Sequence, residues 1–375
     1  MRTRKKAAAA GHICIDITPV FPESTPRSAG FSELLRPGSL VEVKAPDIHT
    51  GGSVANTGLG MKVLGADVRL IGKIGRDSFG AIVRHILDEY GAGDDLIEAE
   101  GEVTSYSVVV APPGIDRVFL HCPGANDSFC RADISEDVLQ DIALFHFGYP
   151  TLLKRMYRDG GAELKALLAD MKERGIATSL DLTAVDPSSE AGKADWEAIL
   201  ADALPYVDFF VPSFEEICSM LQKEHYEELK VRAGERDLTE ILDLERDIRP
   251  LAEKCILMGA KAVLLKCGSP GMYLKTSDHM EETGGRLMLD AEAWNNVSRF
   301  EKSYRIERVL SAAGAGDTSI AGFLTSVLDG SAPEEALRNA AAAGALCCTA
   351  YDSVSGLLPL KEIRSRILAG WEKSW

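Results

Sequence analysis

The chain has 375 residues, of which 46% are hydrophobic, and a formal net charge of −16. This length fits one large α/β domain or two smaller domains, and the apolar content is that of an ordinary globular core. The acidic balance disfavours nucleic acid and anionic membrane as partners, because both require a basic surface. The sequence contains no uninterrupted apolar run of about 18 residues, so it predicts no membrane span.

The eight cysteines are scattered along the chain and form no C-x-x-C pair. This usage favours buried free thiols in a reducing compartment over disulfides or a zinc site. The apolar part of the first ten residues is too short for a signal peptide, since His12 and Asp16 follow soon after it. We therefore expect a cytoplasmic protein.

The first 140 residues mix strand and helix patterns with a polar stretch. Apolar runs predict strands over 8–17 and 68–75, and helical spacing predicts helices from 51 to 64 and over 79–90. Residues 18–48 are rich in Pro, Ser and Glu and hold short β-like pieces, such as 39–43. Residues 104–111 and 117–121 predict a hairpin around the turn 112–116.

From residue 142 onward, strand and helix patterns alternate. Strands are predicted over 142–147, 178–182, 207–211, 262–266 and 271–274, and helices over 161–175, 196–204, 215–221, 250–259 and 333–348. Such alternation predicts a parallel sheet with helices on both faces, whose ligands bind at the carboxyl ends of the strands. Two polar segments, 222–247 and 276–305, look like insertions: the first a solvated helical excursion, the second irregular or β.

Residues 311–318, Ser-Ala-Ala-Gly-Ala-Gly-Asp-Thr, carry the clearest chemical pattern. The small residues leave the backbone N–H groups with little steric cover, and apolar spacing predicts a helix over 318–328 that ends at Gly330. The first N–H groups of a helix lack internal partners and lie at its positive end, so the segment predicts an anion site. Asp317 at this site suggests a base beside a phosphate.

The tetrapeptide Gly-Ala-Gly-Asp also occurs at 91–94, after a predicted helix and before a predicted strand. That context is typical of a helix stop. The copy that ends in Asp317 differs because it leads into a predicted helix whose apolar residues recur at helical spacing. A helix cap without chemistry remains the alternative for Asp317 at this point.

Several motifs, in this order, resemble those of the ribokinase/PfkB family of carbohydrate kinases, over nearly the whole chain. Residues 51–58 (GGSVANTG), 64–66 (LGA) and 71–80 (IGKIGRDSFG) look like the first family signature. Residues 313–318 (AGAGDT) with 321–323 (AGF) look like the second, and 123–126 (PGAN) match the family's short Gly-Ala-Asn turn. Neither a Walker-type phosphate loop nor a G-x-G-x-x-G fingerprint is present.

The resemblance implies an α/β fold: a three-layer α/β/α sandwich over 7–375 with a mostly parallel sheet. It also implies a small β lid over the sugar, built from about 18–48 and 103–122. Lids of this kind exclude water during transfer. In some relatives the lid also forms a dimer interface, so a homodimer through the lid is one expectation.

The same resemblance implies an ATP-dependent kinase that moves the γ-phosphoryl group to a hydroxyl of a sugar or sugar-like substrate. Asp317 would be the catalytic base, and Gly314, Ala315 and Gly316 would form an anion hole for the phosphoryl oxygens. We expect the helix dipole and nearby amides to keep Asp317 ionised.

Further site residues follow from the same resemblance. Substrate hydroxyls would be bound by the five residues Asp16, Gly51, Gly52, Asn56 and Asn126. ATP would contact the five residues Lys266, Gly268, Asn339, Ala343 and Gly344. Mg²⁺, expected in any ATP kinase, would be held through Glu216 and water. Two alternatives stay open: a solvated strand end for Lys266, and close helix packing for the small residues of 333–348.

The chain departs from the family pattern at three places. Ser311 and Ala312 stand where Asp-Thr is common, and the loop 351–356 lacks the usual Gly-Ala, so activation by potassium is not expected. Ser213 replaces the Asn of the Asn-x-x-Glu motif. Gly148-Tyr149-Pro150 stands where ribokinases carry a substrate-side Glu, which argues against free ribose as the acceptor.

Two other functions remain compatible with the sequence. A nucleoside kinase of the same family would need a larger, more aromatic pocket, and the sequence offers no clear stacking residue for one. A catalytically silent sugar-binding relative would keep the fold and lose the chemistry. The altered residues at 213 and 311–312 favour the silent relative, whereas the intact Asp317 segment argues against it.

Overall fold

The computed structural model describes residues 5–25, 31–113 and 118–374. Its main feature is a nine-stranded sheet in the order β13-β12-β11-β10-β9-β8-β1-β4-β5, in which the strands from β11 to β5 are parallel and β12 and β13 are antiparallel. The strands of this sheet are β1 (Lys6–Gly11), β4 (Asp67–Gly75), β5 (Ile97–Ala99), β8 (Ile142–Gly148), β9 (Ala177–Asp181), β10 (Phe209–Phe210), β11 (Ala262–Lys266), β12 (Gly271–Thr276) and β13 (Ser298–Lys302).

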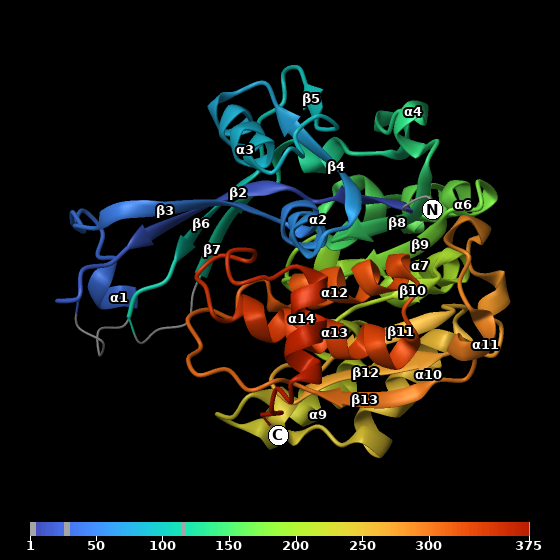
Figure 1. The fold of residues 1–375 in the computed structure, drawn as a ribbon. Coiled ribbons are helices and arrows are strands. Elements are labelled where there is room, and N and C mark those ends of the chain that lie inside the picture. The colour runs from blue at the N-terminus through green and yellow to red at the C-terminus, as the bar shows by residue number, and fades with distance from the viewer. Residues whose placement is uncertain (1–4, 26–30, 114–117, 375) are drawn as a thin grey trace.

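Helices cover both faces of this sheet, which gives the three layers of an α/β/α sandwich (Figure 1). The α-helices are α1 (Phe31–Leu34), α2 (Ser53–Leu64), α3 (Ser78–Glu89), α4 (Glu136–Leu139), α5 (Lys154–Tyr157), α6 (Ala162–Glu173), α7 (Trp196–Ala203), α8 (Phe214–Leu221), α9 (Lys223–Ala233), α10 (Arg249–Leu257), α11 (Ala291–Trp294), α12 (Ala315–Asp329), α13 (Pro333–Cys347) and α14 (Leu360–Leu368). The predicted fold class is confirmed, and the helices expected within 51–64, 79–90, 161–175, 250–259, 318–328 and 333–348 are all present within a few residues.

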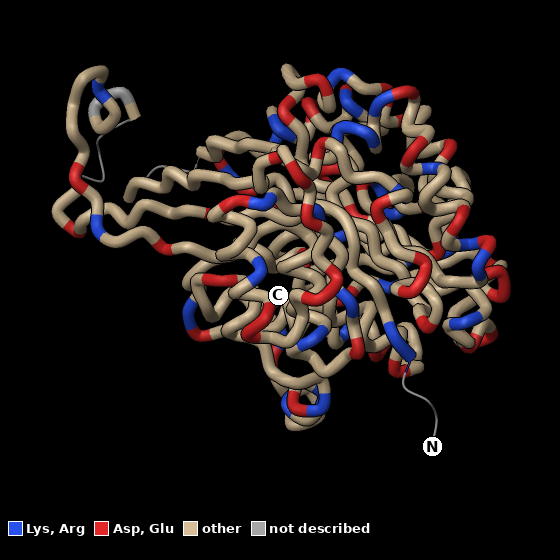
Figure 2. Tube along the Cα trace, turned by 90° about the horizontal axis from the view of Figure 1, so that it is seen from above, with Lys and Arg blue, Asp and Glu red and all other residues tan. Residues whose placement is uncertain are grey.

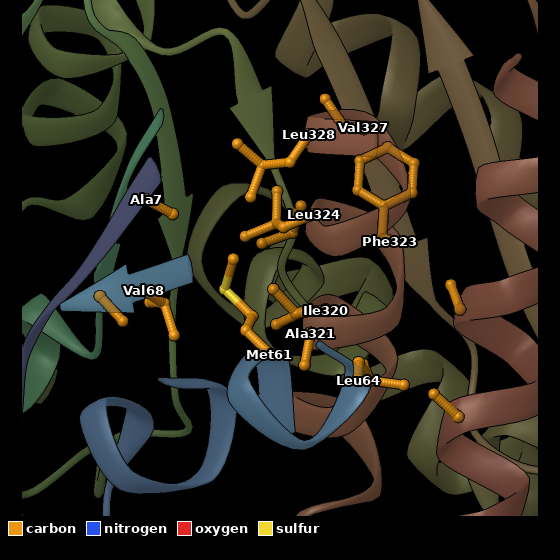
Figure 3. Close-up of a cluster of buried hydrophobic side chains, with 14 of the residues drawn as sticks. Ala7, Met61, Leu64, Val68, Ile320, Ala321, Phe323, Leu324, Val327 and Leu328 are labelled. Carbon is orange, nitrogen blue, oxygen red and sulfur yellow. The ribbon is translucent and has the colours of Figure 1, made fainter. Parts of the chain in front are cut away.

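The sequence of β1 explains why the sheet is buried on both sides. Ala7 and Ala9 belong to the core under α2, α12 and α13, whereas Ala8 and Ala10 belong to the core under α6, α7 and α10. Successive side chains of a strand point to opposite faces, so a continuous apolar run is what a doubly covered parallel strand requires. Figure 3 shows one of these cores, where Met61, Ile320 and Leu324 fill the space between α2 and α12.

A second, four-stranded sheet in the order β3-β2-β6-β7 projects away from the main body (Figures 1 and 2). It contains β2 (Cys14–Val20), β3 (Lys44–Gly51), β6 (Tyr106–Val110) and β7 (Val118–Cys122). Strands β6 and β7 pair antiparallel, as the predicted hairpin requires, although residues 114–116 of the predicted turn 112–116 lie outside the described residues. Residues 39–43, predicted as β-like, are not a strand.

The first predicted strand, 8–17, is wrong as a single element, because the chain changes sheets in its middle. Strand β1 ends at Gly11, whose φ is 125° and where a Cβ atom would lie 2.3 Å from the carbonyl oxygen of Gly148. The side chain of Asn126 then accepts from the amide of Ile13 (3.2 Å) and donates to its carbonyl (2.9 Å). These contacts fix the position at which the chain leaves the main sheet. Asp16 therefore lies in β2 of the small sheet and not near the end of a main-sheet strand.

The two predicted insertions add mixed structure to the main body. Residues 222–247 contain α9, a 3₁₀ turn at Leu238–Ile241 and all but the last residue of a π-helical turn at Leu244–Ile248. Residues 276–305 contain α11 and the edge strand β13. All eight cysteines are free, as predicted. None of the described helices has the length and apolar character that crossing a bilayer requires.

Helices α12 and α13 pack unusually closely, and this packing gives a first prediction. At Gly322 of α12, a Cβ atom would lie 2.9 Å from the Cβ of Ala343 and 2.9 Å from the carbonyl oxygen of Asn339. We expect Gly322→Ala to lower the free energy of unfolding by about 1–3 kcal/mol. The backbones of α12 and α13 cannot make room for the added methyl group unless the two helices move apart. Urea denaturation measures this change. Gly285→Ala is the matched control and should be near neutral, because no described residue other than the two chain neighbours lies within 4 Å of the added carbon. Equal stability of the two variants would contradict the packing argument.

Candidate active site

The candidate site lies at the start of α12, the helix that follows the Gly-Ala-Gly-Asp segment. Gly314 adopts the left-handed conformation (φ 77°) that allows the chain to turn into the helix, and no side chain caps the helix start. The first-turn N–H groups therefore have no side-chain acceptor, as the anion-site prediction requires. Gly314, Ala315 and Gly316 are half-buried, whereas Asp317 is only 5% exposed.

Two donors from different elements hold the Asp317 carboxylate. The amide nitrogen Nδ2 of Asn56, on α2, donates to Oδ2 at 2.9 Å. The hydroxyl of Tyr149, which follows β8, donates to Oδ1 at 2.7 Å. The structure thus brings the predicted residues Asn56 and Asp317 into direct contact. It also places Tyr149, which was not among the predicted site residues, in contact with Asp317.

Burial dominates the electrostatics of Asp317. It raises the pKa of this carboxyl above its usual value, and the hydrogen bonds from Tyr149 and Asn56, together with the charge of Lys266, oppose the rise. The prediction that the helix dipole and nearby amides keep Asp317 ionised was therefore incomplete, because it left out the free-energy cost of burying the charged carboxylate.

A loop after α13 completes the wall beside the start of α12. Ser353 donates through Oγ to Oδ1 of Asn56 at 2.8 Å, which fixes the orientation of the Asn56 amide. A Cβ atom at Gly314 would lie 2.6 Å from the Cβ of Ser353, so only glycine fits at this close approach. From the sequence, the loop 351–356 differed from the family pattern only by lacking Gly-Ala, so Ser353 was not predicted as a site residue.

Lys266, at the end of β11, forms a buried ion pair with Asp181 at the end of β9. Its Nζ lies 2.7 Å from Oδ1 of Asp181, and the two side chains are 12% and 1% exposed. Burial lowers the pKa of Lys266, but the charges of Asp181 and Glu216 outweigh this effect and the pKa is raised. A Cβ atom built at Gly316 would be 3.8 Å from Nζ, so the ammonium group stands beside the anion-site segment. The alternative of a solvated strand-end lysine is therefore excluded.

Glu216 lies in the first turn of α8 and forms a capping box with Ser213. Its Oε2 accepts from the amide of Ser213 at 2.7 Å, and its own amide donates to Oγ of Ser213 at 3.2 Å. Ser213 thus serves as a helix cap where the family pattern has Asn.

The predicted substrate residues Asp16, Gly51 and Gly52 meet where the small sheet joins the main body. Asp16 and Gly51 lie on the neighbouring strands β2 and β3, and a Cβ atom at Gly51 would strike the Asp16 carboxylate at 2.1 Å. Gly52 is the residue before α2, with φ 87°. Burial raises the pKa of Asp16, whereas hydrogen bonds from Cys14 and Ser107 lower it.

An uncharged histidine lies behind this junction. His12 is 2% exposed, and burial lowers its pKa to about 3. Neither of its ring nitrogens has a hydrogen-bond partner among the described residues. Its ring centroid lies 5.4 Å from that of His121 and 6.1 Å from that of Tyr149. No role for His12 was predicted from the sequence.

Asn126 takes a different role from the one implied by the resemblance. Its amide is fully buried and is engaged with both backbone groups of Ile13, as described above. Asn126 therefore stabilises the segment in which the chain passes from the main sheet to the small sheet.

The predicted ATP contacts divide into two groups. Gly268 lies in the turn between β11 and β12 with φ 62°, close to Lys266, and packs against Thr239. Asn339, Ala343 and Gly344 are buried, and they face α12. Nδ2 of Asn339 donates to Oγ of Ser326 on α12 at 2.9 Å. These three residues serve helix packing, the alternative noted from the sequence. The side chains of Asn339 and Ala343 and the Cα face of Gly344 are covered by α12 and cannot meet a nucleotide without opening the core.

Comparisons with known proteins agree with this geometry. Residues 5–359 match the model of the pfkB family carbohydrate kinases, so the chain belongs to that family and is a carbohydrate kinase. An uncharacterised sugar kinase of Archaeoglobus fulgidus is 28% identical over 303 residues, which are 80% of this chain and 98% of that protein. The ribokinase of Arabidopsis thaliana is 24% identical over 340 residues, 89% of this chain and 75% of that protein.

Solved structures share the fold. The structure of Arabidopsis thaliana ribokinase complexed with ribose and ATP superposes with a TM-score of 0.69 at 19% identity, covering 96% of this chain and 98% of that one. Xylella fastidiosa fructokinase with bound ATP gives a TM-score of 0.69 at 18% identity, covering 98% and 99%. At this level of identity the comparison establishes the fold alone.

Proposed function

We propose that this carbohydrate kinase transfers the γ-phosphoryl group of ATP to a hydroxyl of a sugar, with Asp317 as the base. The observation that carries the proposal is a buried carboxylate at an uncapped helix N-terminus, held by donors from two other elements. Asp317 would accept the proton of the attacking hydroxyl. Phosphoryl transfer requires mainly positioning and charge stabilisation, and the site offers both.

The phosphoryl end of the site would be formed by the segment from Gly314 to Gly316 and by Lys266. The first-turn amides of α12 point their N–H groups toward incoming anions, and the helix dipole favours negative charge there. One donor of the Lys266 ammonium group is used by Asp181, which leaves two for phosphoryl oxygens. Gly268, in the neighbouring turn, would allow the nucleotide to approach the backbone.

The residues present suit magnesium held through water. Glu216 offers a carboxylate oxygen, and Oδ2 of Asp181 is buried with no hydrogen-bond partner in the described part of the chain, so hard oxygen donors are available nearby. The described residues include no cluster of three or more acidic, histidine or cysteine side chains that could hold a metal by themselves. That composition fits Mg²⁺, which keeps several waters and binds substrate phosphates; when bound, it would neutralise phosphate charge.

The sugar would bind between the main body and the small sheet, which we propose acts as a lid. Asp16 can accept from a diol, and Gly51 and Gly52 let a ligand approach the backbone. Asn56 links this region to Asp317 directly. The small sheet projects from the body beside this junction (Figure 1), so its closure over the junction would exclude water.

The test is ADP release from Mg-ATP across pentoses, hexoses, sugar acids and nucleosides, with the product identified by mass spectrometry. We expect turnover on a sugar and a product heavier by one phosphoryl group. Turnover on nucleosides alone would replace the proposal with a nucleoside kinase. ATP binding without turnover on any acceptor would favour a catalytically silent relative.

We also propose that the lid pairs with a second copy of the chain. Its edge strand β7 carries Phe119 and Leu120, each more than half exposed, and Val20 and Ile48 on β2 and β3 are also exposed. An exposed apolar edge strand favours pairing. We expect light scattering to give a dimer mass, and Leu120→Lys to lower it towards the monomer; a monomeric wild-type protein would contradict the proposal.

A further inference from the structure

Tyr149 stands out because its backbone is strained at the candidate site. It has φ 63° and ψ 46°, in the left-handed region, immediately before Pro150. A bulky residue avoids this conformation, at a cost of the order of 1–2 kcal/mol. The other described non-glycine residues with positive φ, Asp159, Met288 and Asn296, are exposed, whereas the phenol of Tyr149 contacts the buried Asp317. Strain of this kind persists where the surroundings impose it, which is often at functional sites.

The strained turn carries the Tyr149 side chain to Asp317. At the end of β8, a Cβ atom at Gly148 would lie 2.2 Å from the Cβ of Ser53, so the strand end and the start of α2 are in close contact. The chain turns sharply after this contact, and the amide of Tyr149 donates to the carbonyl of Asp181. The phenol then reaches Oδ1 of Asp317 at 2.7 Å.

The contact with Tyr149 completes a clamp on the carboxylate. Asn56 holds Oδ2, and Ser353 holds Asn56 in turn. With one donor on each oxygen, rotation of the carboxylate about its bond to Cβ is restricted. Each oxygen still has a lone pair, so a sugar hydroxyl can approach without displacing either donor.

We propose that Tyr149 is a positioning residue for Asp317, which holds the carboxylate in the orientation that receives the proton of the attacking sugar hydroxyl. This inference rests on the proposed function of Asp317 as base. Tyr149 does not itself gain or lose a proton in the step; the hydroxyl proton passes to Asp317 as the oxygen bonds to phosphorus and the bond to ADP breaks.

The surroundings of Asp317 predict how the phenol acts on it. Ionisable groups on four elements face this carboxyl: Lys266 on β11, Asp181 on β9, Glu216 on α8 and Cys347 on α13. Burial raises the pKa of Asp317, and the hydrogen bond from Tyr149 is one of the interactions that oppose the rise. Removing the phenol hydroxyl should therefore raise the pKa further. A base works above its pKa, so the acid limb of the activity profile should move to higher pH.

Tyr149→Phe tests the inference, because it removes one oxygen and keeps the ring. We expect kcat at neutral pH to fall about ten-fold or more, as for loss of a hydrogen bond to a charged group. KM for ATP should stay unchanged. A ten-fold effect corresponds to a pKa shift of one unit, or 1.36 kcal/mol. We therefore expect the acid limb of kcat/KM to move to higher pH by about one unit. Activity should recover in part at alkaline pH.

Tyr157→Phe, on α5, is the matched control and should leave both kcat and the pH profile unchanged. A loss in Tyr149→Phe that is equal at every pH would indicate a structural role and overturn the inference, as would an unchanged kcat. Thermal unfolding of the variant checks that the fold is retained. If the wild-type protein phosphorylates no acceptor, both the proposed function and this inference are wrong. If the wild-type protein is active and Tyr149→Phe has the same kcat and pH profile, only this inference is wrong.

Discussion

Asp317→Asn should lower kcat by a factor of about 10² to 10⁴, the range for loss of a positioned general base. The amide has no lone pair of comparable basicity, so the hydroxyl proton would have no acceptor as the oxygen attacks. The measurement is ADP release under saturating sugar and Mg-ATP. Binding of ATP, followed by calorimetry, should change little, because the helix N-terminus and Lys266 remain.

The geometry indicates that this variant keeps its fold. The new amide can accept from Asn56 through its oxygen and donate to the phenol oxygen of Tyr149, since a hydroxyl both donates and accepts. The control is Asp94→Asn, at the last residue of the second Gly-Ala-Gly-Asp copy. Asp94 is exposed and lies between α3 and β5, and we expect its replacement to leave kcat unchanged. Wild-type turnover in Asp317→Asn would exclude Asp317 as the base.

Lys266→Met should lower both activity and stability. We expect kcat to fall about 10²-fold or more, in the range reported for loss of one donor to a developing negative charge. We also expect the free energy of unfolding to fall by about 3–5 kcal/mol, because Asp181 would remain buried without its cation. Methionine has a similar length, so the loss reflects charge rather than volume. Steady-state kinetics and urea denaturation give the two values.

The stability loss in Lys266→Met should depend on pH with a defined sign. Burial raises the pKa of Asp181 well above its usual value. Without Lys266, nothing of comparable strength opposes this effect. A carboxyl whose pKa is higher in the folded than in the unfolded state favours folding at low pH, and that stability is lost as pH rises above about 4. The variant should therefore lie closer to the wild-type stability at pH 5 than at pH 8.

A second change separates the two roles of Lys266. Adding Asp181→Asn removes the unpaired charge, so the double variant should regain much of the stability of the wild-type protein without regaining activity. Recovery of both properties would show that Lys266 acts only as the partner of Asp181. A Lys266→Met protein of wild-type stability at pH 8 would contradict the buried ion pair.

Much of the site could be predicted from the sequence because it depends on local signals. Gly314 and Gly330 mark the ends of α12, and the apolar spacing between them sets its buried face, so the helix and the place of Asp317 in its first turn were predicted without a structure. Asn56 was found by its place in a glycine-rich helix start that resembles the family signature. The roles of Asn339, Ala343 and Gly344 were not decided in this way, because small residues suit a nucleotide and a helix contact equally well.

Local patterns were therefore enough to predict the alternating elements, the doubly covered sheet and the helix start that carries Asp317. These features follow from residues that lie within a few turns of one another. Three others became visible only in the folded chain: the break after Gly11, the pair of Lys266 with Asp181, and the contact of Tyr149 with Asp317. Each of these joins residues from distant parts of the chain, 85 positions apart for the ion pair and 168 for the phenol. Local pattern cannot encode such pairings, because they arise only when the carboxyl ends of several strands meet at one edge of the sheet.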